Sequence, residues 1–349
     1  MNTWRNDIIV FDESLQKLKT YISSIFSAQK IVVICDTNSA KYCLPHINDY
    51  VISSQPFHSI IINAGEENKT MESALHLWNE FTNLQLSKSD LIINLGGGMI
   101  CDLGGFAASI YKRGVPFIHI PTTLLAQIDA SIGGKTGIDW NGIKNLIGTI
   151  HAPEKIFISS LFLETLPERE YNSGLAEALK HGLISNAAYW KLLTTADELN
   201  RIELIEKSII IKTDIVEADP YEKNIRKKLN FGHTIGHALE SYFIHQNNPV
   251  LHGEAVAAGM ICEAYISQMS GLISAEELST ISSSIKNMFE SLHFQLNDIE
   301  KITENVLHDK KNNGEQILMV LLHGIGNTVI DIPVSRELIN DSLKYYASL

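Results

Sequence analysis

The sequence predicts an α/β protein in which an N-terminal Rossmann-like domain precedes a mainly α-helical C-terminal domain. Up to about residue 160, short β-branched runs alternate with helical patterns, which is typical of a parallel sheet covered by helices. Three consecutive glycines follow one of these runs, and from about residue 165 the pattern is mainly helical. A chain of 349 residues is long for one hydrophobic core. We therefore expect two domains, residues 1–162 and 163–349.

The composition, 45% hydrophobic and 19% charged, is that of an ordinary soluble globular protein. No segment of the sequence approaches the ~20 apolar residues that span a bilayer, and the first ten residues lack the pattern of a signal peptide. The four cysteines form no C-x-x-C motif, which favours a location in the reducing cytoplasm. The net charge of −12 opposes non-specific binding to nucleic acid, but it permits a small anionic ligand where basic residues gather.

Two β-branched runs open the predicted sheet. Residues 30–36 predict a buried parallel strand that ends in Asp36. An acid at that edge can accept hydrogen bonds from a ribose, or it can simply start the next turn. A second strand, residues 59–63, runs into a turn with Glu66 and Lys69, where ligands gather in open α/β sheets. The helix that follows has its apolar residues at helical spacing: Met71, Leu75, Trp78 and Phe81.

A triple glycine links the strand at residues 90–95 to a helix at residues 99–112. Glycines let the backbone approach a ligand, and a helix N-terminus offers free N–H groups and a positive dipole end to a pyrophosphate. The motif departs from G-x-G-x-x-G because Cys101 occupies the position of the third glycine. It favours a dinucleotide site, and the next strand, residues 115–120, has a polar exit at Thr122 and Thr123.

The segment Gly134-Lys135-Thr136 resembles the end of a phosphate-binding P-loop. That motif needs a glycine where this sequence has Asp129, so a P-loop nucleotide hydrolase is not expected. Lys135, Lys144 and Asn145 then remain as polar residues of a glycine-rich loop region.

Helices dominate the C-terminal half. Glu177 and Lys180 are three residues apart and share one face of a helix that opens near residue 167. Lys212 lies on a second amphipathic helix, residues 203–218. The other expected elements are a short strand at residues 156–159, helices at residues 254–271, 275–292 and 337–346, and a hairpin of residues 317–322 with residues 328–332.

Three of the thirteen histidines lie close together in the sequence. His233 and His237 are four residues apart, so they share one face of a helix, and His252 opens the next segment. Imidazole is the commonest side-chain metal ligand, and paired histidines can hold one divalent ion. The same spacing also occurs in helices whose histidines cap, pack or face water, so these residues alone leave both interpretations open.

Six segments in consistent order resemble the 3-dehydroquinate synthase family of sugar-phosphate cyclases. The resemblance covers about residues 30–330 and implies a dehydroquinate synthase-like fold, an NAD⁺ that is regenerated in each turnover, and a homodimer. It also implies a divalent metal, with zinc first and cobalt as the alternative. Met99 and Cys101 depart from the family pattern in the glycine-rich turn. The six segments are residues 96–106, 120–137, 144–148, 175–182, 229–240 and 252–257.

The resemblance assigns roles residue by residue. It implies that Glu177, His233 and His252 bind the metal, with a fourth position left for water or substrate. His237 is then left for hydrogen bonding and proton transfer, and Arg113 would reach the site of the neighbouring subunit. The residues implied to contact NAD are Asp36, Glu66, Lys69, Gly97, Gly98, Met99, Asp102, Thr122, Thr123, Lys135, Lys144 and Thr165. Those implied to contact the substrate are Asp129, Lys135, Asn145, Lys180, Lys212, Arg226, Asn230 and one or both of Lys310 and Lys311.

The implied activity is that of a carbon–oxygen lyase in the shikimate pathway, which leads to chorismate and the aromatic amino acids. Its substrate, 3-deoxy-D-arabino-heptulosonate 7-phosphate, would be converted to 3-dehydroquinate and phosphate by transient oxidation with NAD, phosphate elimination, re-reduction and aldol cyclisation. This anion needs a local positive field in an acidic protein, and each close charge pair contributes up to ~4 kcal/mol at an effective dielectric of 20, before desolvation. We expect a homodimer without nucleic-acid or membrane partners.

Three other functions are compatible with parts of this pattern. A metal- and NAD-dependent dehydrogenase of the glycerol type shares the expected fold, but it would release NADH and would not need the dense basic set. A sister cyclase that makes 2-deoxy-scyllo-inosose or a valiolone would take a different phosphorylated sugar. Lys212, Arg226 and Asn230, which match the carboxylate-binding pattern, argue against that cyclase. A non-enzymatic binding module would have no reason to retain all three metal ligands.

Overall fold

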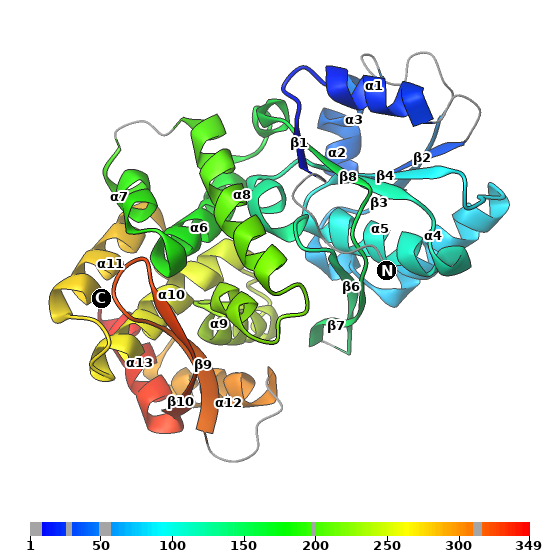
Figure 1. Ribbon diagram of the computed structural model, residues 1–349. Coiled ribbons are helices and arrows are strands. Elements are labelled where there is room, and N and C mark those ends of the chain that lie inside the picture. Colours follow the sequence, from blue (N-terminus) through cyan, green and yellow to red (C-terminus); the bar gives the residue numbers. More distant parts are fainter. Residues whose placement is uncertain (1–8, 26–29, 49–56, 142, 197–199, 310–315) are drawn as a thin grey trace. The chain divides into compact units, whose positions relative to one another are not determined.

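The computed structural model describes residues 9–25, 30–48, 57–141, 143–196, 200–309 and 316–349 (Figure 1). The chain divides into two compact units, Met1–Pro167 and Glu168–Leu349. We expected the boundary between residues 162 and 163, and the first compact unit extends to Pro167. Each unit is described by itself below.

A six-stranded sheet forms the centre of the first unit. In every neighbouring pair the two strands are parallel, so the prediction of a Rossmann-like domain is confirmed. In spatial order, the strands are β1 (Ile9–Phe11), β8 (Lys155–Ile158), β5 (Phe117–Pro121), β4 (Leu91–Gly96), β2 (Ile31–Asp36) and β3 (Phe57–Ile62). The helices of this unit are α1 (Gln16–Ile25), α2 (Thr37–Tyr42), α3 (Leu44–Ile47), α4 (Met71–Asn83) and α5 (Gly98–Ile110).

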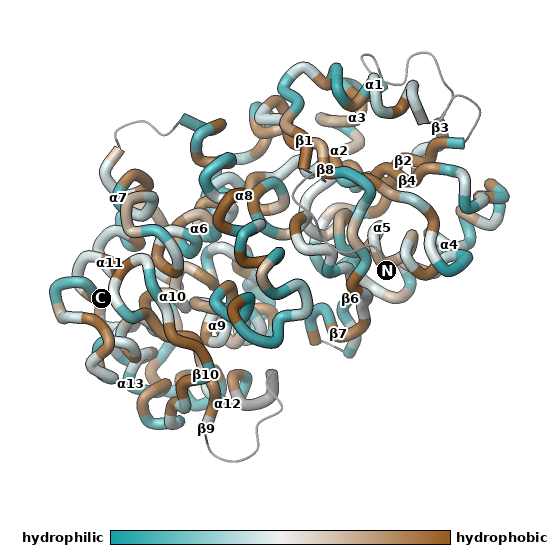
Figure 2. Tube along the Cα trace, in the orientation of Figure 1, coloured by the Kyte–Doolittle hydropathy of each residue, from teal (hydrophilic) through white to brown (hydrophobic). Residues whose placement is uncertain are grey.

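Both faces of this sheet are buried, because successive side chains of a strand point to opposite faces. On β2, Val33 and Cys35 join an apolar cluster with residues of α1 and α3. Val32 and Ile34 join a second cluster with residues of α4 and α5. Figure 2 shows the same strands as predominantly hydrophobic. The β-branched run at residues 30–36 is therefore a central strand, as predicted.

The helix α4 turns a different face to the sheet from the one we expected. Leu75, one of the four apolar residues named at helical spacing, is 50% exposed. Ala74 and Leu77 are buried, together with Phe81 of the predicted set. Ala74 and Leu77 lie one position before Leu75 and Trp78, and the smaller Ala74 is brought against the sheet.

A β-hairpin occupies the region that we predicted to be a glycine-rich loop. Its strands, β6 (Lys135–Trp140) and β7 (Ile143–Ile150), are antiparallel, and Gly137 pairs with Gly148. A Cβ atom at Gly148 would lie 2.3 Å from the carbonyl oxygen of Thr136. The glycines therefore allow two strands to approach closely, and the loop prediction was wrong.

Helices make up most of the second unit. They are α6 (Glu168–Ser185), α7 (Ala187–Thr195), α8 (Arg201–Ala218), α9 (His233–His245), α10 (His252–Met269), α11 (Ala275–Met288), α12 (Ile299–Asp309) and α13 (Arg336–Ser348). A short 3-10 helix, η7 (Ile225–Asn230), precedes α9. The predicted hairpin is present as β9 (Gln316–Leu322) and β10 (Thr328–Ser335), which are antiparallel. The mainly helical prediction for this half is confirmed.

The helix α10 lies at the centre of the second unit, where it packs against α6, α9, α11 and α13. It buries residues on all its sides, as expected of a helix enclosed by others. Among the described helices of the chain, none combines the length and apolar character that a membrane crossing requires.

Candidate metal and cofactor sites

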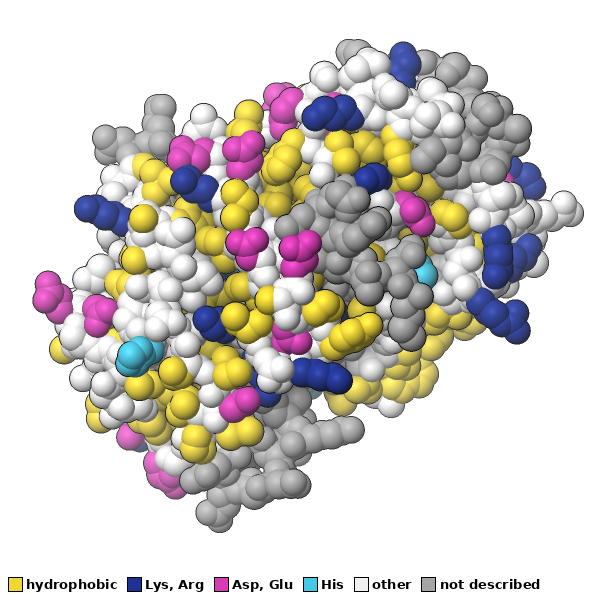
Figure 3. Space-filling view, viewed as in Figure 1, with side chains coloured by type: hydrophobic (Ala, Val, Ile, Leu, Met, Phe, Trp, Pro, Cys, Tyr) yellow, Lys and Arg dark blue, Asp and Glu magenta, His cyan; other side chains and the backbone are white. Residues whose placement is uncertain are grey.

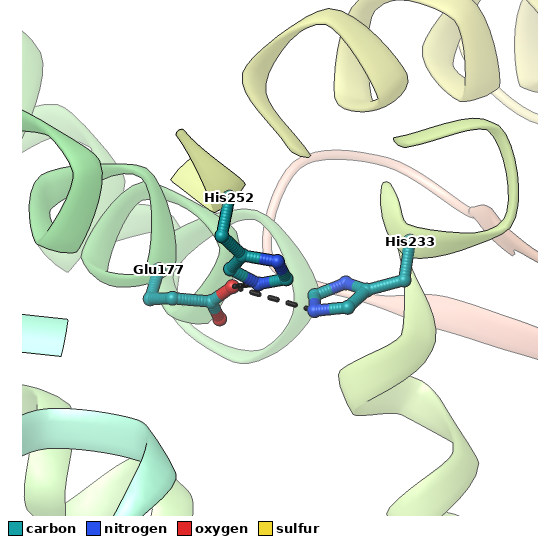
Figure 4. A group of neighbouring side chains, drawn as sticks. All are labelled: Glu177, His233 and His252. Atoms are coloured by element: carbon teal, nitrogen blue, oxygen red, sulfur yellow. Dashed lines mark ion pairs between the residues drawn. The ribbon is translucent and has the colours of Figure 1, made fainter. Parts of the chain in front are cut away.

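Three helices of the second unit each contribute one side chain to a compact group that could bind a metal ion. Glu177 lies in the middle of α6, His233 is the first residue of α9, and His252 is the first residue of α10. The Nε2 atoms of both histidines lie 3.4 Å from the same oxygen, Oε1 of Glu177 (Figure 4). The three ligand atoms lie within 4.8 Å of one another. This is the trio that the family resemblance implies.

The donor atoms of this group suit a divalent metal. The Nδ1 atom of His233 lies 3.1 Å from the carbonyl oxygen of Phe231, so we assign the ring hydrogen to Nδ1. The Nε2 lone pair of His233 then faces Glu177 and is available to a metal. Glu177 is 0% exposed, and neither of its carboxylate oxygens has a well-formed hydrogen bond in the described structure. Two imidazole nitrogens and one carboxylate oxygen form a ligand set typical of catalytic zinc.

The local charges hold the three ligands in different protonation states. Burial raises the pKa of Glu177, but its neighbours, above all the cation of Lys180, outweigh burial and hold this pKa well below its usual range. Burial, assisted by Lys180, lowers the pKa of His233 to about 4, so its ring is neutral at neutral pH. Burial also lowers the pKa of His252, but Glu177 and Glu240 outweigh it and raise this pKa to about 9. Metal binding must therefore displace a proton from His252.

His237 stands beside this group without belonging to it. It lies one turn after His233 on α9, with the two ring centroids 5.2 Å apart. The centroid of His237 is 5.8 Å from that of His252. A third imidazole thus lies next to the three donor atoms, and the division of roles between His233 and His237 stays a prediction.

The predicted substrate residues of the second unit include three buried cations. Lys180, Lys212 and Arg226 are 1%, 6% and 2% exposed and lie on α6, α8 and η7, which pack together. Lys180 forms an ion pair with Glu177. Burying a cation is costly unless an anion or hydrogen bonds compensate it. The arrangement therefore concentrates positive charge inside the unit, whereas Lys and Arg are dispersed on the face shown in Figure 3.

A second cluster of charged residues lies in the first unit and centres on Lys69. The side chain of Lys69 is 3% exposed, and its Nζ lies 3.4 Å from Asp102 Oδ2 and 3.5 Å from Asp139 Oδ1. Glu66 also pairs with Lys69, and Lys144 lies 3.9 Å from Glu66. Burial raises the pKa of Asp102 to about 7, although Lys69 opposes this shift. Four of these five residues were predicted to contact NAD, and the fold brings them together.

Two family models match the chain: 3-dehydroquinate synthase N-terminal over residues 59–173, and 3-dehydroquinate synthase C-terminal over residues 174–312. The 3-dehydroquinate synthase of Parabacteroides distasonis is 40% identical over 344 residues, which cover 97% of each chain. The chain belongs to the 3-dehydroquinate synthase family. The resemblance inferred from the six sequence segments is thereby confirmed.

Solved structures of other sugar-phosphate cyclases share the fold. The 2-epi-5-epi-valiolone synthase of Streptomyces hygroscopicus subsp. jinggangensis, solved with NAD⁺ and Zn²⁺, has a TM-score of 0.87 at 23% identity, covering 100% of this chain and 98% of its own. A 2-deoxy-scyllo-inosose synthase in complex with carbaglucose-6-phosphate, NAD⁺ and Co²⁺ has a TM-score of 0.85 at 25% identity, covering 97% and 96%. Both agree with the predicted fold class.

Several family-implied residues lie elsewhere in the first unit. Asp36 caps α2, where its Oδ1 accepts hydrogen bonds from the N–H groups of Asn38 and Ser39. The alternative that this acid starts the next turn is therefore realised, and a contact of Asp36 with ribose stays a prediction. Ligand contacts also stay predictions for nine further residues. They lie at the glycine-rich start of α5, after β5, on η5 (Ala126–Ala130), on the hairpin β6–β7 and after η6 (Ser160–Leu163). The nine residues are Gly97, Gly98, Met99, Thr122, Thr123, Asp129, Lys135, Asn145 and Thr165. Lys310 and Lys311 lie outside the described residues.

Sequence reasoning missed residues that support the predicted ones. Glu240 Oε2 lies 3.7 Å from Nδ1 of His252, behind the ring. Glu222 accepts a hydrogen bond of 2.7 Å from Nδ2 of Asn230. Glu240 could have been found, because it is seven residues after His233 and so lies two helical turns along the same face. Glu222 offered no such signal, because it lies in an irregular segment before η7.

Proposed function

We propose that the chain is a 3-dehydroquinate synthase that converts 3-deoxy-D-arabino-heptulosonate 7-phosphate into 3-dehydroquinate and phosphate. The observation that carries the proposal is the group of Glu177, His233 and His252, with Glu177 buried, in a chain that both family models match. The product would enter the shikimate pathway toward chorismate.

NAD⁺ and a divalent metal, zinc or its alternative cobalt, complete this proposal. The related cyclases were solved with NAD⁺ and with Zn²⁺ or Co²⁺. When bound, the metal polarises a substrate hydroxyl, and NAD⁺ accepts a hydride and later returns it. Glu177, His233 and His252 would hold the metal. Gly97 and Gly98, at the start of α5, would let the pyrophosphate approach the backbone.

The chain's own residues would bind and orient the substrate. The buried cations Lys180, Lys212 and Arg226 would neutralise its carboxylate and phosphate, and they supply charge that a dehydrogenase for a neutral alcohol does not need. His237, beside the metal ligands, would exchange protons with the substrate. Orientation of one bound molecule through several steps supplies much of the expected acceleration.

The second candidate is a sister cyclase that acts on another sugar phosphate, because such enzymes share the fold. Phosphate release by the metal- and NAD⁺-loaded chain distinguishes the two. We expect kcat/KM for the heptulosonate phosphate to exceed that for glucose 6-phosphate by at least about 100-fold, because the buried cations would be left without the substrate carboxylate. Faster release from glucose 6-phosphate would favour the sister cyclase.

The chain is further proposed to form a homodimer in which Arg113 of each subunit reaches the other's site. Arg113 is exposed on a 3-10 turn of the first unit. The β6–β7 hairpin exposes Leu146 and Ile150, each by 53%, together with Trp140 and Ile143. Exposed apolar side chains in this number are typical of an interaction surface. These exposed apolar side chains support the dimer, and the mass of the protein in solution tests it.

Light scattering at micromolar concentration should report twice the mass of one chain. A Leu146→Asp variant should report the mass of a single chain, because it places a charge in the proposed interface. A wild-type protein with the mass of one chain would refute the dimer.

A location in the cytoplasm is also proposed, and the four free, buried cysteines support it.

A further inference from the structure

The position of His233 depends on how the helix α9 begins, because His233 is its first residue. A helix start has four N–H groups without partners inside the helix, and a side chain at the N-cap usually accepts one of them. Here the N-cap is Gly232, in the left-handed conformation with φ of 79°, and it has no side chain to do so. The start of α9 therefore needs an acceptor from elsewhere.

Glu263, in the middle of α10, supplies that acceptor. Its Oε2 accepts a hydrogen bond of 2.7 Å from the N–H of Gly232, and its Oε1 accepts one of 3.1 Å from the N–H of Ile235. Glu263 is 0% exposed. The two hydrogen bonds bracket His233 on both sides in the sequence. One carboxylate thus fixes the turn of backbone that carries a metal-ligating side chain.

Close packing adds to this constraint. A Cβ atom at Gly259 would lie 2.0 Å from the carbonyl oxygen of Gly232, so the start of α9 rests directly on α10. The helix α10 also begins with His252. The same rigid helix therefore carries one histidine of the trio and sets the backbone position of the other. The segment of α10 from residue 252 to residue 263 therefore sets the distance between the rings of His252 and His233.

We propose that Glu263 is a positioning residue that holds His233 in the geometry required for metal binding. It acts through the backbone of α9 and does not touch the metal or the substrate. This inference rests on the proposed metal site. A chain that binds no Zn²⁺ at the site would overturn the proposed function, whereas a chain that binds Zn²⁺ independently of Glu263 would overturn only the role of Glu263.

The test compares two variants that each disturb a buried backbone N–H group. Glu263→Gln replaces one carboxylate oxygen by an NH₂ group that faces an N–H donor. Ser267→Ala, one turn further along α10, removes the Oγ that accepts a hydrogen bond of 3.0 Å from the N–H of Leu322. Both Glu263 and Ser267 are 0% exposed, so both variants should lower the Tm. Only Glu263→Gln alters the start of α9.

The affinity of the full chain, stripped of metal, for Zn²⁺ is measured by competition with a chromophoric chelator. We expect Glu263→Gln to weaken binding by about 10- to 100-fold, as loss of a group that orients a ligand does, and Ser267→Ala to change it by less than about twofold. In a His233→Ala background, Glu263→Gln should have no further effect. If Glu263→Gln does not fold, Glu263→Asp keeps the charge, is too short to reach both N–H groups, and should show the same pattern.

Equal weakening by Glu263→Gln and Ser267→Ala would show that Glu263 serves only general stability and would overturn the inference. An unchanged Zn²⁺ affinity of Glu263→Gln, or an undiminished effect in the His233→Ala background, would overturn it as well.

Discussion

Replacing His252 by alanine should abolish metal-dependent turnover. His252 supplies one of the three donor atoms. Its Nε2, like that of His233, lies 3.4 Å from Oε1 of Glu177. Two donors remain in the variant, which is too few for a catalytic zinc site. We expect Zn²⁺ affinity to fall by at least about 100-fold, the upper end of the effect of losing a group that merely orients a ligand. Chelator competition and phosphate release measure the two effects separately.

His245→Ala is the matched control for this experiment. It also removes an imidazole from the second unit, but His245 is exposed at the end of α9, where its Nδ1 contacts the carbonyl oxygen of Ser241. Zn²⁺ affinity and turnover should stay within about twofold of wild type, as is usual for an exposed position away from special contacts. Unchanged Zn²⁺ affinity and activity of His252→Ala would refute its role as a ligand.

Replacing Lys69 by methionine should have the largest effect on the stability of the first unit. The variant keeps the aliphatic volume but leaves Asp102, Asp139 and Glu66 without the cation that they share. Removing one partner of a buried ion pair costs about 3–5 kcal/mol, and we expect about 3 because the carboxylates are partly exposed. Urea unfolding of the first unit, followed by hydrogen exchange in β4, measures the loss.

This loss should shrink as the pH falls. The pKa of Asp102 is already raised to about 7 with Lys69 present, and it rises further without the cation. An acid whose pKa is higher in the folded than in the unfolded state lowers stability progressively between these two pKa values. The stability of wild type therefore levels off above about pH 7, whereas that of the variant, with the higher folded pKa, continues to fall. The difference from wild type should therefore be larger at pH 8 than at pH 5. A difference that grew toward pH 5 would contradict this assignment.

Lys144→Met is the control for Lys69→Met. Lys144 belongs to the same cluster, but it lies 3.9 Å from Glu66 and its side chain is 26% exposed. Solvent screens such a pair, so we expect a loss below about 1 kcal/mol. Similar losses for the two variants would show that burial of Lys69 does not determine its contribution.

The sequence predicted the sheet well because its strands have a distinctive composition. A central parallel strand is buried on both faces, so residues 31–35 form a continuous apolar run that a helix surface would not require. The hairpin β6–β7 escaped prediction because its paired glycines, Gly137 and Gly148, are typical of loops. These glycines allow the two strands to approach closely. That approach is a tertiary contact, which local propensity does not encode.

The metal site was predictable only by resemblance to a family. The spacing of His233 and His237 alone suggests that these two histidines chelate together, but His252 and the distant Glu177 complete the trio with His233. Asp139 and Glu263 were not predicted at all. Each acts on residues far away in the sequence, Lys69 and the start of α9, and only the fold brings them together.

The most direct test of the account is the number of phosphates released per NAD⁺. The Zn²⁺-loaded chain is given 3-deoxy-D-arabino-heptulosonate 7-phosphate in large excess over NAD⁺, and phosphate is measured together with NADH absorbance. The account predicts many phosphates per NAD⁺, no accumulation of NADH, and loss of release after chelation. Accumulation of NADH in step with consumed substrate, without phosphate, would contradict it and indicate a dehydrogenase.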